Sequence, residues 1–101
     1  MATVFIPSLM RKLTDGRDTV EVAGSTLRQV IDNLDTEYPG IKELIVENGR
    51  VRPGLQLAVD GVLSATGLMG KVPEGSEVHI LPALGGGQGR PAAAQSPRTV
   101  S

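Results

Sequence analysis

The sequence contains no cysteine and no tryptophan, and Phe5 and Tyr38 are its only phenylalanine and tyrosine. Without cysteine the chain cannot form a disulfide, a thiol nucleophile or a zinc–thiolate site. His79 is the single histidine, so no second imidazole is present to share a metal ion. The core must therefore be built from valine, isoleucine and leucine, and we expect no bound metal ion.

A strong net charge and a long apolar run are also absent. Ten basic and eleven acidic residues give a formal net charge of −1, without the clustered basic residues expected of a nucleic-acid-binding face. No apolar run approaches the roughly 20 residues that span a bilayer. Charged residues such as Arg11, Lys12 and Asp15 leave no apolar signal segment near the N-terminus. We expect a cytosolic protein with neither a nucleic-acid nor a membrane partner.

The 101 residues suffice for one small domain, and the composition changes at Gly85–Gly87. After that point Val100 is the only large apolar residue, so we expect residues 88–101 to form a disordered tail. Residues 1–87 carry eight basic and eleven acidic side chains, a net charge of −3, whereas Arg90 and Arg98 give the tail a charge of +2. The prediction is one folded domain, residues 1–87, followed by the tail.

Alternating and β-branched segments predict five strands, and one helical pattern lies between the second and the third. The predicted strands are Thr3–Ile6, Thr19–Val22, Leu55–Val59, Val62–Leu63 and Glu77–Leu81. The order β-β-α-β-β-β predicts an α+β fold with the helix packed across one sheet face.

The helix is predicted from an apolar face with helical spacing: Leu27, Val30, Ile31, Leu34 and Tyr38. Ser25 or Thr26 is the expected N-cap, and Pro39-Gly40 ends the helix. If Thr26 is the cap, Gln29 completes a capping box.

Shorter signals predict the connections. Ile41, Leu44 and Ile45 indicate a second helical turn, and Glu47–Arg50 is expected to be a turn or an exposed loop. Asp60-Gly61 is typical of a two-residue hairpin turn.

The strand and helix phases divide the apolar residues between two faces. The predicted core is Val4, Ile6, Val20, Val22, Leu27, Val30, Ile31, Leu34, Leu57, Val59, Val78 and Ile80. The opposite phase places Phe5, Ala58, His79 and Leu81 on the sheet face away from the helix. An apolar group on that face indicates a partner surface.

Residues 1–87 resemble the MoaD/ThiS family of ubiquitin-like β-grasp sulfur carriers. The resemblance rests on the last strand, Val78–Leu84, which runs directly into Gly85-Gly86-Gly87. Ile6-Pro7, Tyr38-Pro39-Gly40 and Val59-Asp60-Gly61 also match the family pattern. The branch with a Leu-Pro-Ala segment before the glycines includes carriers for cysteine synthesis and small subunits of molybdopterin synthase.

This resemblance implies that the C-terminal glycine carboxylate is adenylated and then converted to a thiocarboxylate. Gly86-Gly87 would be the diglycine and Gly87 the modified residue, with Gly85-Gly86 as the alternative register. Glycine suits this role because an extended chain without Cβ atoms enters a narrow channel and leaves its carbonyl unhindered. The implied partners are an ATP-using adenylating enzyme of the MoeB/ThiF type and a sulfur-acceptor enzyme. The carrier itself would bind no cofactor.

The fourteen residues after Gly87 depart from the family pattern, because they leave Gly87 without a free carboxylate. Either a protease removes residues 88–101, or the chain is a ubiquitin-like interaction module or protein modifier that never receives sulfur. No acidic pair has spacing that assigns it to acid and base catalysis, so we expect no catalytic residues and no enzyme activity.

Overall fold

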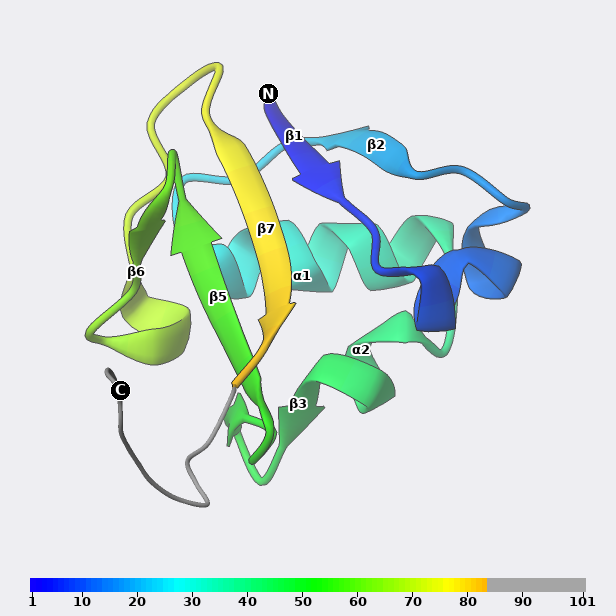
Figure 1. Cartoon of the computed structure of the whole chain (residues 1–101). Coiled ribbons are helices and arrows are strands. Elements are labelled where there is room, and N and C mark those ends of the chain that lie inside the picture. Colours follow the sequence, from blue (N-terminus) through cyan, green and yellow to red (C-terminus); the bar gives the residue numbers. More distant parts are fainter. Residues whose placement is uncertain (84–101) are drawn as a thin grey trace, which may run out of the picture.

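The computed structural model describes residues 1–83 and shows a five-stranded sheet with helices on one side (Figure 1). The strand order is β2-β1-β7-β5-β6. The strands are β1 (Ala2–Phe5), β2 (Thr19–Val22), β5 (Leu55–Val59), β6 (Val62–Leu63) and β7 (Glu77–Pro82). Strand β7 pairs parallel with β1 and antiparallel with β5, so the sheet is mixed and its last strand is central. The predicted α+β fold is confirmed.

Helix α1 (Leu27–Glu37) covers one face of the sheet, and α2 (Ile41–Ile45) follows it after a tight turn. Thr26 is the N-cap, and its hydroxyl accepts a hydrogen bond from the Gln29 amide at 3.2 Å. The Gln29 side chain returns to the amide of Ser25 instead of that of Thr26. The first bond of the predicted capping box is therefore present, whereas its second bond is donated by the residue before the N-cap.

The connections contain elements that the sequence did not predict. The turn expected within residues 47–50 is present at Asn48-Gly49, but the residues on either side of it were not predicted to be strands: β3 (Val46–Glu47) and β4 (Arg50–Val51) pair in a separate two-stranded sheet. Two 3-10 helices, η1 (Ser8–Thr14) and η2 (Gly67–Met69), complete the fold. The Asp60-Gly61 hairpin is confirmed, with both residues at positive φ (52° and 84°).

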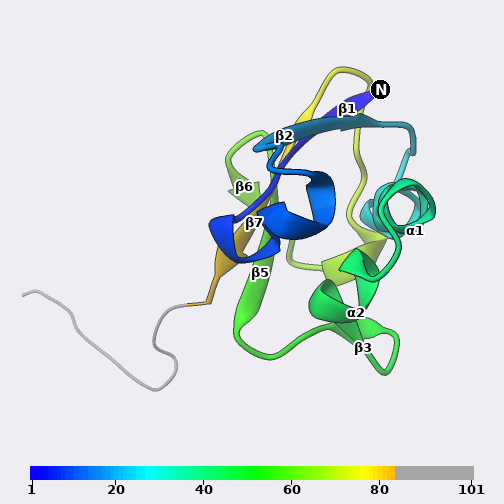
Figure 2. The same ribbon diagram turned by 90° about the vertical axis from the view of Figure 1, so that its right-hand side faces the viewer.

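The core lies between the sheet and the helices, which Figure 2 shows on the same side of the sheet. All predicted core residues are buried except Val59, which is half-buried and packs against the core. The prediction omitted Ile41 and Ile45 of α2, whose side chains are fully buried. It also omitted Ala2, Met10 and Val72. Within residues 1–83, no helix has the length and apolar character needed to cross a membrane.

Candidate functional site

Strand β7 carries the chain toward the predicted diglycine and is held in the sheet almost to the limit of the described residues. Pro82 is in register with Leu55, and the Ala83 amide donates to the Gly54 carbonyl at 2.8 Å. Ladder bonds alternate along an antiparallel strand, so the Pro82 nitrogen faces the side where β1 has already ended. Proline therefore fits here without breaking the ladder.

The predicted site residues Gly86 and Gly87 lie outside the described residues, as do the alternative Gly85 and the predicted boundary at residue 87. They follow Ala83 in sequence by only two to four residues. The fold thus fixes the chain shortly before the glycines, in the middle strand of the sheet.

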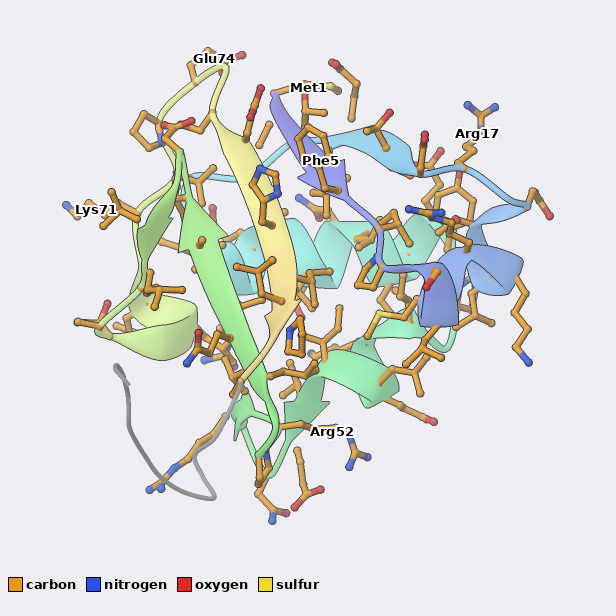
Figure 3. All side chains as sticks on the ribbon, in the orientation of Figure 1. Met1, Phe5, Arg17, Arg52, Lys71 and Glu74 are labelled. Carbon is orange, nitrogen blue, oxygen red and sulfur yellow. The ribbon has the colours of Figure 1, made fainter. Side chains whose placement is uncertain are left out.

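The sheet face away from α1 carries one apolar row that crosses four strands. The register aligns Phe5 of β1 with His79 of β7, His79 with Ala58 of β5, and Ala58 with Leu63 of β6. The Phe5 and His79 rings stack with centroids 4.2 Å apart and planes 7° from parallel. Figure 3 labels Phe5 on strand β1. The predicted outward orientation is confirmed.

The members of this row differ in exposure. Leu63 is 52% exposed and Leu81, in the next row toward the end of β7, is 37% exposed, whereas Phe5 and His79 are half-buried. Ala58 is only 3% exposed, so its expected role as contact surface is wrong. Its methyl group is shorter than the side chains of its cross-strand neighbours, His79 and Leu63, and is covered between them. We call Phe5, Leu63, His79 and Leu81 the outer patch.

Leu63 was missed by the sequence prediction, although the sequence holds the signal. A two-residue Asp60-Gly61 turn pairs Val59 with Val62 and therefore Ala58 with Leu63. Leu63 must then share the outward phase of Ala58.

An acidic margin borders the outer patch at the start of β7. Thr3 is in register with both Glu21 and Glu77, and its hydroxyl donates to the Glu21 carboxylate at 3.2 Å. The His79 Nε2 atom lies 3.6 Å from a Glu77 carboxylate oxygen. The patch is thus acidic at one end and apolar toward the end from which the chain leaves the sheet.

Asp60 belongs to the same margin and has a structural role. Its carboxylate accepts bonds from the Glu77 amide at 2.9 Å and the Ser76 hydroxyl at 2.8 Å. These two bonds hold the pKa of Asp60 below its ordinary value of 3.8, and the bond from the Glu77 amide has the larger effect. Among residues 1–83, no group of three or more His, Asp or Glu side chains is arranged to hold a metal ion.

Comparison with known proteins identifies the class to which this fold and site belong. The ThiS family matches residues 4–87, so the chain belongs to this family of ubiquitin-like sulfur carriers, and it is a carrier and not an enzyme. The sulfur carrier protein CysO of Mycobacterium tuberculosis is 34% identical over 90 residues, which cover 84% of this chain and 97% of CysO.

Solved structures of CysO proteins are also similar to this chain. A crystal structure of M. tuberculosis CysO has a TM-score of 0.79 and 31% identity, covering 83% of this chain and all of that chain (100%). A chain in the Amycolatopsis orientalis BexX/CysO complex has a TM-score of 0.80 and 30% identity, covering 83% of this chain and 97% of that one. Small archaeal modifier protein 1 of Methanosarcina acetivorans, at 21% identity and a TM-score of 0.69, shares the fold.

Proposed function

We propose that this protein carries sulfur as a thiocarboxylate on Gly87 and delivers it for cysteine biosynthesis. A Gly87 carboxylate oxygen attacks the α-phosphate of ATP, which forms an acyl-adenylate and releases pyrophosphate. A sulfur nucleophile then attacks the glycyl carbonyl, and AMP leaves. An adenylating enzyme of the MoeB/ThiF type would hold the ATP, and a separate enzyme would accept the sulfur.

One observation carries this proposal: the match to the ThiS family ends at residue 87, the second residue of Gly86-Gly87. The anchoring of β7 supports it, because the sheet holds the chain up to Ala83, two residues before the first glycine in sequence. The similarity to CysO, a named sulfur carrier protein, supports cysteine as the destination.

The outer patch is the proposed docking surface for the adenylating enzyme. It combines the Phe5–His79 stack with exposed Leu63 and Leu81 beside the last strand. Exposed apolar groups of this kind mark protein interfaces. The margin with Glu21 and Glu77 calls for basic groups on the partner at that end, which would fix the orientation of the carrier.

The residues after Gly87 make activation depend on proteolysis. In the full chain the Gly87 carbonyl belongs to a peptide bond with Gln88, so it offers no carboxylate to ATP. We expect a protease to remove residues 88–101 before the adenylating enzyme acts.

Intact-mass spectrometry tests the proposal with two purified forms, the full chain and a chain ending at Gly87. Each is incubated with the native adenylating enzyme, ATP and a sulfide donor. The shortened form should gain the mass of one sulfur-for-oxygen replacement without a protease, and the full chain should stay unchanged. Gly87→Ala in the shortened form should react more slowly, because its methyl group crowds the carbonyl.

The control is an authentic family carrier treated with the same enzyme preparation. If that carrier is converted and the form ending at Gly87 is never adenylated, the carrier proposal for Gly87 is wrong. Conversion of a form ending at Gly86 instead would move the site to the alternative register.

A further inference from the structure

A groove lies on the helix side of the molecule, between α1, η2 and the β3–β4 turn. Two adjoining hollows, of about 140 and 380 Å³, share Arg28 of α1, Gly49 of the turn and Leu68 of η2. Half-buried Val51 and Leu68 give it an apolar wall, and Met69 at its edge is 71% exposed. This groove is not part of the outer patch.

The charged residues of the groove are mostly basic. Lys42 pairs with Asp32 at 2.5 Å, so these two charges neutralise each other. Arg28 and Arg50 are exposed and make no ion pair or side-chain hydrogen bond within residues 1–83. Two guanidinium groups without a partner among residues 1–83 therefore flank an apolar wall, in a domain whose overall charge through residue 87 is −3.

We propose that this groove binds an acidic segment of a partner protein. An apolar side chain of that segment would pack on Leu68 and Met69, while carboxylates on either side would pair with Arg28 and Arg50. Arginine suits this role because its planar guanidinium binds a carboxylate through two parallel hydrogen bonds.

The apolar wall and the charge balance favour a peptide over other anions. A phosphate ion would gain nothing from Leu68 and Met69. Single-stranded nucleic acid needs aromatic side chains on which bases stack, and neither Phe5 nor Tyr38 lines the groove.

The position of the groove allows two partners at once. Figure 2 shows α1 and α2 on one side of the sheet, opposite the face that carries the outer patch. A protein held at the groove would leave the outer patch and the end of β7 free. This inference does not depend on sulfur transfer, because the groove contains none of the residues proposed for it.

Titration by two-dimensional ¹⁵N NMR tests the groove on the full chain. The probe is a short peptide with Leu-Phe at its centre and Asp and Glu on both sides; the comparison peptide has Asn and Gln instead. The acidic peptide should shift the amide signals of Arg28, Gly49, Arg50 and Leu68 saturably. Arg28→Glu combined with Arg50→Glu should weaken its binding at least about tenfold.

Matched controls separate a site from general charge attraction. Lys12→Glu combined with Arg17→Glu changes the net charge equally on exposed residues away from the groove, and should weaken binding no more than about twofold. Phe5→Glu should leave peptide binding unchanged. Equal losses in the two charge-reversal pairs, equal binding of the neutral peptide, the same shifts with inorganic phosphate, or no shifts in the groove would each overturn the proposal.

Discussion

The two faces of strands β1 and β7 differ sharply, although the same few residues of chain supply both. On the inner face Val4 and Val78 are 1% exposed beneath α1, whose Leu27 and Leu34 are fully buried. On the outer face Phe5 and His79 remain half-buried and Leu81 is exposed. Because successive strand residues point to opposite faces, stability and recognition alternate residue by residue.

This division has a practical consequence for mutagenesis. A substitution on the inner face should change the free energy of unfolding, and one on the outer face should change binding with little effect on folding. Neighbouring residues in one strand, such as Val4 and Phe5, should therefore behave differently.

The largest effect is expected on the inner side from Leu34→Ala. Leu34 is fully buried in the core, so its truncation should lower the free energy of unfolding by about 2–5 kcal/mol. Chemical denaturation measures this change. Leu44→Ala is the matched control, because Leu44 of α2 is 41% exposed and should change stability by less than about 0.5 kcal/mol. A loss that small at Leu34 would mean that α1 does not pack as described.

The second prediction concerns the outer face and uses Phe5→Glu. The substitution removes the stack on His79 and places a negative charge at the β1 end of the outer patch. Binding to the adenylating enzyme should weaken by about 1.4 kcal/mol or more, a tenfold change in affinity, while the thermal unfolding profile stays close to that of the natural chain.

Titration calorimetry measures this binding. Leu44→Glu is the control, since it introduces the same charge at an exposed apolar residue of α2, on the helix side and outside the groove. If Phe5→Glu binds the adenylating enzyme with unchanged affinity, the outer patch is not its docking surface.

Long, strongly periodic segments could be predicted from the sequence. The apolar spacing from Leu27 to Tyr38 defined α1, and the alternation in Leu55–Val59 gave the exact range of β5. The Asp60-Gly61 turn set the hairpin register because few residue pairs accept positive φ at both turn positions. The outward phase of Phe5 and His79 followed from the same alternation.

Short elements and side-chain exposure could not be predicted in this way. Strands β3 and β4 have two residues each, too few to show a period. Burial of Ala58 depends on the length of its cross-strand neighbours, which a single strand does not reveal. The groove depends on Arg28 and Arg50, which are far apart in sequence and meet only when η2 and the β3–β4 turn pack near α1.

The smallest effect is expected at Asp60 of the acidic margin, whose carboxylate also supports the fold. Bonds from the Glu77 amide and the Ser76 hydroxyl hold the pKa of Asp60 below 3.8, so its carboxylate stabilises the folded state above that pH. This contribution should disappear as the pH falls through the lowered folded-state pKa. Asp60→Asn should therefore be less stable than the natural chain near neutral pH, and the difference should shrink in acid.

Denaturation curves between neutral pH and about pH 2.5 measure this difference in stability. Asp18→Asn is the control, because the Asp18 carboxylate makes no hydrogen bond or ion pair within residues 1–83. A difference for Asp60→Asn that stays constant with pH would show that the carboxylate charge does not stabilise the start of β7.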